Sequence, residues 1–191
     1  KLNVMGGSFG LFSVPGDLCL FAAAAHITGK PISLSMSYTE HQHFSGKRSA
    51  CHSNGRVACD QNGKLIAAEF EYGLDHGAYS LSGDGLMLKP ACFAFFPYAV
   101  PNVAGLSRIA NTNHNYGAAC RGFGAPQTFL LSESLMDMLA KKTGIDPFEL
   151  RFQNIARPGD TTINNRPYQR YPMEEIMQAM RPIYEQAKRE L

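Results

Sequence analysis

The sequence has no hydrophobic run long enough to cross a bilayer. Its longest apolar stretch, residues 18–25, falls far short of the roughly 20 residues that a transmembrane helix needs. An excess of charge of either sign is also missing: the formal net charge is +2, and no basic run with interleaved aromatic residues occurs. These absences argue against a membrane protein and against a nucleic-acid partner.

Cysteine is scarce and irregularly placed. Five cysteines are an odd number at uneven spacing, so we expect free thiols in a reducing compartment and no disulfide framework. The cytoplasm is therefore the expected location, with the periplasm left open. The first residues lack an initiator Met and the pattern of a signal peptide, which predicts a strand belonging to a longer polypeptide.

Signatures of several common sites are missing as well. No Gly-Lys-Ser/Thr phosphate loop occurs, and no Gly-x-Gly-x-x-Gly fingerprint with a downstream acid is present. His41, His43 and His52 do not form a zinc pattern with nearby cysteines, and we interpret them as scattered surface and strand residues.

What is present indicates an ordinary globular chain of 191 residues, 45% apolar and 18% charged. The patterns of apolar, turn and capping residues predict strands at 2–5, 32–36, 49–60, 64–75 and 103–112. They predict helices at 17–28 and 126–143, another from 146, and one from 173 that Pro182 interrupts. Gly83 and Gly85 favour a loop before a short helix. Because strands and helices do not alternate regularly, the predicted class is α+β.

Two glycine-rich segments stand out, Gly6–Gly10 and residues 117–127. Both pair an aromatic residue with glycines, which let a backbone approach a ligand closely. The second also carries Arg121, a permanent cation with five hydrogen-bond donors. Together they indicate two loops that close on a flat, polar, anionic cofactor.

These segments resemble the molybdenum-binding subunit of the xanthine dehydrogenase and aldehyde oxidoreductase family, which has a Gly-Gly-x-Phe-Gly loop and an Arg-Gly-Phe/Tyr-Gly-x-Pro-Gln loop. The resemblance covers nearly the whole chain in order and is closest to bacterial aldehyde oxidoreductases. It extends over Asp75–Ser80, Val100–Asn102, Leu135–Ala140, Gly144–Pro147, Glu149–Arg151, Asn154 and Arg157–Asp160. It implies a molybdopterin cofactor and a fold of two-layer mixed sheet-and-helix units.

The resemblance also assigns roles to residues. It implies contact with the cofactor for Gly6, Gly7, Phe9, Gly10, Arg121, Gly122 and Gly124. It places Ser13, Lys89 and Phe123 in the substrate pocket. No side chain ligates the metal in this family, and the catalytic glutamate comes from far downstream, so we expect no catalytic residue within this chain and no activity from the chain alone.

Two positions bear on the substrate. Ser13 stands where purine-oxidising relatives often have a glutamate, and Lys89 falls where an arginine often holds substrate. Both differences favour oxidation of aldehydes to carboxylic acids, with water as the oxygen source, over purine oxidation. The alternatives are a hydroxylase of N-heteroaromatics, of nicotinate or purine type, and a non-catalytic scaffold or assembly piece.

The expected organisation is one part of a molybdenum-cofactor-binding domain over residues 1–191, with a β-rich portion at 1–112 and a cofactor loop and helical portion at 113–191. The resemblance implies three partners: a small-molecule aldehyde or heteroaromatic substrate, the remaining part of the molybdenum subunit, and an iron–sulfur domain or subunit. The sequence does not decide whether the protein forms a homodimer or whether the pterin is the cytosine dinucleotide form.

Overall fold

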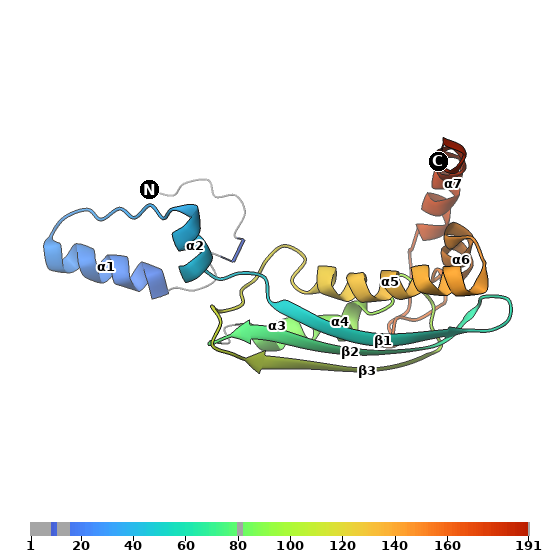
Figure 1. Cartoon of the computed structure of the whole chain (residues 1–191), viewed down its shortest axis with the longest axis horizontal. Coiled ribbons are helices and arrows are strands. Elements are labelled where there is room, and N and C mark those ends of the chain that lie inside the picture. Colours follow the sequence, from blue (N-terminus) through green and yellow to red (C-terminus); the bar gives the residue numbers. More distant parts are fainter. Residues whose placement is uncertain (1–8, 11–15, 80–81, 191) are drawn as a thin grey trace. The chain divides into compact units, whose positions relative to one another are not determined.

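The computed structural model describes residues 9–10, 16–79 and 82–190. The chain divides into two compact units, each assembled from three separate segments. The first contains residues 1–52, 73–87 and 108–123, and the second contains residues 53–72, 88–107 and 124–191. Helices and strands occur together without regular alternation, which confirms the predicted α+β class (Figure 1). The predicted strand at 2–5 lies outside the described residues.

Three strands form one sheet in the order β1-β2-β3. They are β1 (Ala50–Cys59), β2 (Leu65–Gly77) and β3 (Asn102–Asn111). The turn between β1 and β2 is built by Asp60, whose carboxylate accepts hydrogen bonds from the amides of Asn62 and Lys64. Gly63 has a φ of +82°, a conformation that favours glycine. The hairpin predicted from Asn62-Gly63 is therefore confirmed.

In the second unit, helix α5 (Ala125–Thr143) packs on the sheet. Gly55 of β1 lies against Leu131 and Leu135 of the helix, where a larger side chain would collide. The Tyr72 hydroxyl donates a 2.9 Å hydrogen bond to the carbonyl of Thr128. The helix ends, as predicted, at Gly144, which has a φ of +72°.

Helix α6 (Pro147–Asn154) begins at the predicted cap, Asp146, whose carboxylate accepts bonds from the amides of Phe148 and Glu149. At its other end the buried side chain of Asn154 accepts a bond from the Leu65 amide and donates to the carbonyl of Gly63. All of these distances lie between 2.8 and 3.2 Å. Asn154 therefore fixes the hairpin turn to α6.

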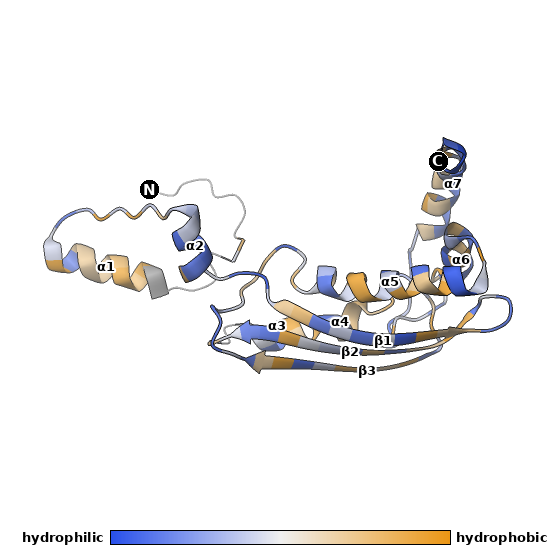
Figure 2. Ribbon diagram, in the orientation of Figure 1, coloured by the Kyte–Doolittle hydropathy of each residue, from blue (hydrophilic) through white to orange (hydrophobic). Residues whose placement is uncertain are grey.

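Helix α7 (Met173–Glu190) runs through Pro182 without a break, so the predicted interruption is wrong. Proline removes one amide donor, but contacts to α6 on both sides of it support the helix. The Arg181 guanidinium pairs with Glu149, and the Lys188 ammonium lies 2.7 Å from Asp146. Ile176, Met180 and Ile183 of the same helix are exposed, and α7 contains both hydrophobic and hydrophilic residues (Figure 2).

The first unit contains α1 (Gly16–Thr28), α2 (Tyr38–Phe44) and α3 (Gly83–Met87). Helix α1 matches the prediction and is rich in apolar residues, although Leu18 and Ile27 are exposed (Figure 2). Two predictions are wrong: the strand predicted at 32–36 does not form, and the predicted loop containing Gly83 and Gly85 is helical.

Local hydrogen bonds explain the first of these errors. Ser37 ends the extended stretch as the cap of α2, because its hydroxyl accepts from the Glu40 amide and its own amide donates to the Glu40 carboxylate. The expected short helix after Gly83 and Gly85 is present as α4 (Lys89–Phe93), which belongs to the second unit.

Among the residues that the structure describes, none of the helices combines the length and apolarity that a bilayer crossing requires.

Candidate functional site

The end of the first glycine-rich segment has an unusual backbone. Phe9 has a φ of +50° and Gly10 a φ of +96°. For phenylalanine this left-handed conformation costs roughly 1–2 kcal/mol. The Phe9 side chain is 76% exposed, whereas Gly10 is buried. The other predicted residues of this segment, Gly6, Gly7 and Ser13, lie outside the described residues.

The second segment repeats this conformation. Gly122, Phe123 and Gly124 have φ values of +91°, +41° and +96°, so three successive residues are left-handed. The amide of Phe123 closes the turn with a 2.8 Å bond to the carbonyl of Cys120. Arg121, which lies within this turn, is exposed. Strain of this kind is kept only where the surroundings hold it, and it is frequent at ligand sites.

Within the first unit the two segments meet. A Cβ atom on Gly10 would lie 2.5 Å from the carbonyl oxygen of Gly46 and 3.1 Å from the Cβ of Ala118. Gly46 is equally confined, since its own Cβ would lie 2.5 Å from that of Ala118. Segments about 110 positions apart in the sequence therefore lie close together, and a side chain at Gly10 or Gly46 would collide there.

Residues 45–49 join the two segments, and we call them the bridging segment. The Lys47 amide donates to the carbonyl of Tyr116 at 3.3 Å, and the Lys47 carbonyl accepts from the Ala118 amide at 2.8 Å. The Asn115 side chain donates to the carbonyl of Ser45 at 2.5 Å. Further along, the Arg48 guanidinium donates to the carbonyl of Arg121 at 2.6 Å.

A buried polar pair lies beneath the second segment. Ser49 Oγ and His76 Nδ1 are 2.8 Å apart, and the Gly117 amide donates to the carbonyl of His76 at 2.6 Å. Burial lowers the pKa of His76, against the opposing charge of Asp75, so the ring is neutral at neutral pH. A neutral ring can share one proton with the serine hydroxyl without leaving a buried charge.

Asp75 orders the approach to this segment. Its carboxylate accepts bonds from the Thr112 hydroxyl at 2.6 Å and the Gly77 amide at 3.0 Å, and it lies 2.6 Å from His114 Nδ1. The Thr112 hydrogen bond is the main cause of a lowered Asp75 pKa, so the carboxylate is charged over the physiological range. Residues 112–116 are thus fixed to the end of β2.

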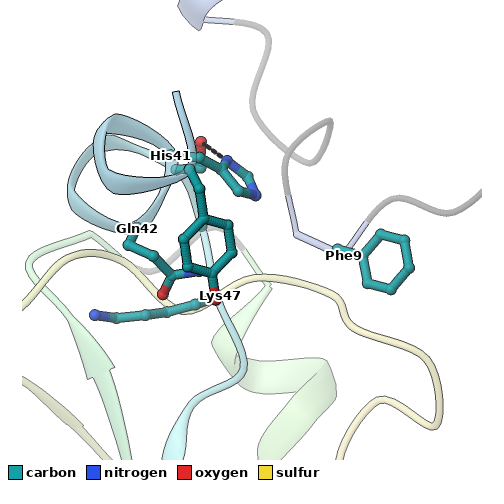
Figure 3. A pocket seen from close by; sticks show the side chains of 7 residues that line it. Phe9, His41, Gln42 and Lys47 are labelled. Atoms are coloured by element: carbon teal, nitrogen blue, oxygen red, sulfur yellow. Dashed lines mark hydrogen bonds between the residues drawn. The ribbon is translucent and has the colours of Figure 1, made fainter. Parts of the chain in front are cut away.

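A pocket of about 330 Å³ lies in the first unit beside Phe9 (Figure 3). His41 Nδ1 bonds Ser45 Oγ at 2.6 Å, while the Phe9 ring points away from His41 and Lys47. The residues that line the cavity include aromatic, amide and ammonium side chains. They are Phe9, Tyr38, His41, Gln42, Ser45, Gly46 and Lys47.

Lys89, the other predicted substrate-pocket residue, is half-buried at the start of α4 and belongs to the second unit. Its ammonium lies 5.5 Å from the centre of the Phe93 ring, a cation–π contact. Its place in a substrate pocket stays a prediction. Phe123 lies beside α3, where its ring would be 3.3 Å from a Cβ on Gly85.

Sequence reasoning found both loops but missed the bridging segment. Gly46 and Arg48 were not predicted as site residues, because Ser-Gly-Lys-Arg-Ser contains no aromatic residue and follows an ordinary short helix. The one available signal was a glycine beside two basic residues. No group of three or more His, Cys, Asp or Glu side chains that could hold a metal occurs within residues 9–10, 16–79 and 82–190.

Two glycine loops that lie close together, one with an exposed arginine, are an arrangement typical of a cofactor-binding domain. A model of the molybdopterin cofactor-binding domain matches residues 1–155, and the chain belongs to this family. The chain is 43% identical over 185 residues to the aldehyde oxidoreductase of Megalodesulfovibrio gigas, covering 97% of this chain and 20% of the relative. The predicted family is confirmed.

More distant relatives and solved structures agree. The nicotinate dehydrogenase large molybdopterin subunit of Eubacterium barkeri is 32% identical over 154 residues, which are 81% of this chain and 36% of the relative. The aldehyde oxidoreductase of Desulfovibrio desulfuricans superposes with a TM-score of 0.93 at 41% identity, over 98% of this chain and 21% of that one. The chain spans about a fifth of the length of the aldehyde oxidoreductases it matches.

Proposed function

We propose that this chain forms one wall of the cofactor site in a molybdenum hydroxylase that oxidises aldehydes to carboxylic acids, with water as the oxygen source. The observation that carries the proposal is the contact of Gly10 with Gly46 and Ala118. It brings the first glycine segment against the second, so that both can face one ligand. A scaffold without a ligand would have no need of two strained Phe-Gly turns at this place.

The residues present fit a flat, anionic pterin. Gly6, Gly7, Phe9, Gly10, Gly122 and Gly124 would offer backbone approach, and Arg121 would offer its guanidinium. None of the described carboxylates pairs with Arg121, whose charge therefore remains available for an anion or an electron-rich oxo group. The bound cofactor supplies the redox chemistry, and the chain supplies placement and charge.

An aldehyde is the substrate that the sequence favours. Identity to the aldehyde oxidoreductase is 43%, against 32% for the nicotinate enzyme and 31% for the xanthine dehydrogenase/oxidase of Gallus gallus. Ser13 has no carboxylate that could hydrogen-bond a purine. Lys89 has a single charged ammonium where an arginine would make two parallel hydrogen bonds. Phe123 would present the face of its ring to the substrate. An N-heteroaromatic of nicotinate type is the second candidate, because the nicotinate dehydrogenase subunit is a relative.

The proposal extends to the parent enzyme. We place the chain in a longer molybdenum subunit that works with an iron–sulfur domain or subunit in the cytoplasm. The cofactor is molybdopterin, with the cytosine dinucleotide form as one candidate. The domain boundary proposed at residue 112 separates a β-rich portion from the portion that carries Arg121.

Elemental mass spectrometry of the intact parent protein from its native host tests the proposal. We expect about one molybdenum per chain. A panel of acetaldehyde, benzaldehyde, nicotinate and xanthine then separates the substrate classes, and we expect the aldehydes to give the highest kcat/KM. Folded protein without molybdenum, from cells supplied with the metal, would favour the scaffold. Nicotinate as the best substrate would favour the second candidate.

A further inference from the structure

We infer that the bridging segment sets the separation of the two cofactor loops, and that Arg48 is a positioning residue that orients Arg121. The inference rests on the proposed function, because it assigns the two loops to one cofactor. It adds a third element, residues 45–49, which neither loop motif contains and which contacts both of them.

The first step is the backbone contact at Gly46. A Cβ at this residue would meet Ala118 and Tyr116 of the second segment at 2.5 Å and the Gly10 carbonyl oxygen at 2.8 Å. Lys47, the next residue, forms a parallel bridge to Gly117. The bridging segment therefore contacts both loops at the place where they approach each other. A side chain at Gly46 would force them apart, since its Cβ would lie 2.5 Å from that of Ala118.

The second step concerns the peptide of Arg121. Its carbonyl accepts the 2.6 Å bond from Arg48, and the next three residues are the left-handed ones. A carbonyl held by a charged donor fixes the peptide plane at the point where the chain turns. The Cα of Arg121 is part of that peptide, so the bond also restricts the direction in which its side chain leaves the backbone.

The third step is a division of labour between two arginines. Arg48 donates a hydrogen bond to the protein backbone. The guanidinium of Arg121 would then be the group that contacts the cofactor. A positioning group of this kind affects reaction rate more than ligand retention, because small misplacements at a reacting centre are costly. The remaining glycine and backbone contacts would keep the cofactor bound.

The test uses the intact parent enzyme with Arg48→Gln and Arg48→Lys, and Arg56→Gln as a charge-matched control on the exposed face of β1. Arg56 is 88% exposed and 3.7 Å from Glu69. We expect Arg48→Gln to retain molybdenum and melting temperature, to lower kcat at saturating aldehyde about tenfold or more, and to change the Mo(V) electron paramagnetic resonance signal. Arg48→Lys should recover part of kcat, since an ammonium can also donate to the carbonyl.

Amide hydrogen exchange over residues 117–124 of the cofactor-free protein gives a readout independent of activity. Faster exchange in Arg48→Gln than in Arg56→Gln supports positioning. Unchanged exchange with unchanged kcat overturns it, and so does an equal loss of melting temperature and kcat that lysine does not recover. If the wild-type protein binds no molybdenum but Arg48→Gln still speeds amide exchange over residues 117–124, the proposed function is wrong. The role of Arg48 in holding the second loop is then still supported.

Discussion

Ser49 Oγ lies 2.8 Å from His76 Nδ1, and both residues are buried beneath the backbone of Gly117. A Cβ on Gly117 would collide with both of these atoms. The pair therefore packs directly against the backbone of the second glycine loop and limits how closely that loop can approach it. The loop residues that precede Arg121 have no room to move toward β2.

Gly117→Ala should lower the free energy of unfolding by about 1–3 kcal/mol, the usual cost of overpacking. It should also reduce the molybdenum content of the intact enzyme, because the loop backbone must move away from Ser49 and His76 to make room for the added methyl group. Gly73→Ala is the matched control in β2, since its Cβ would meet only the His52 carbonyl at an ordinary 3.9 Å. Equal effects of the two substitutions would contradict a special role for Gly117.

Asn154→Ala should destabilise the chain by about 2–3 kcal/mol, because it leaves the buried Leu65 amide and Gly63 carbonyl without partners. Urea unfolding measures the change. Gln153→Ala is the control, since that side chain makes one 3.3 Å bond to Asn62 at the surface. A loss no larger than that of the control would show that the turn does not depend on α6.

Asp146 should make the free energy of unfolding depend on pH in the acid range. Burial raises its pKa, but hydrogen bonds from Lys188, Tyr184 and two helix amides outweigh that effect and hold the pKa at about 2. The folded-state pKa is below the unfolded value of 3.8, so this stabilisation is complete above about pH 4 and is lost as the pH falls toward 2.

Two substitutions separate the charge of Asp146 from its capping role. Asp146→Asn keeps a capping oxygen, and the difference in stability from wild type should shrink between about pH 4 and pH 2. Asp146→Ala should cost a further ~1 kcal/mol at every pH, because the cap is lost. Urea unfolding of both variants over this pH range measures these effects. A wild-type to Asn difference that does not change with pH would refute the assignment.

Phe123 offers a test of the substrate wall. Phe123→Tyr should leave KM for benzaldehyde nearly unchanged, and Phe123→Ala should raise it by about 2- to 10-fold, the value of one ring contact. Acetaldehyde, which has no ring, is the internal control. If both aldehydes change equally, the ring holds the loop against α3 and does not contact substrate.

Local sequence signals succeeded where short-range bonds decide the structure. Asn62-Gly63 predicted the hairpin, and Gly144 predicted the end of α5, because both glycines adopt conformations that other residues avoid. The alternation in residues 32–36 did not predict the structure correctly, because a strand needs a partner and none of the described strands pairs with this stretch. Pro182 failed as a stop signal, since contacts to α6 offset one lost hydrogen bond.

The sequence by itself determined the family, the α+β class and the two glycine loops, because ordered motifs and glycine positions are readable without coordinates. Only the tertiary structure decided that Gly10 lies near Ala118, that Gly46 packs against Ala118, and that Arg48 donates to the Arg121 carbonyl. These contacts join residues about 70 to 110 positions apart. No local propensity reports such pairings, because they depend on how the chain returns to the same place after β1, β2 and β3.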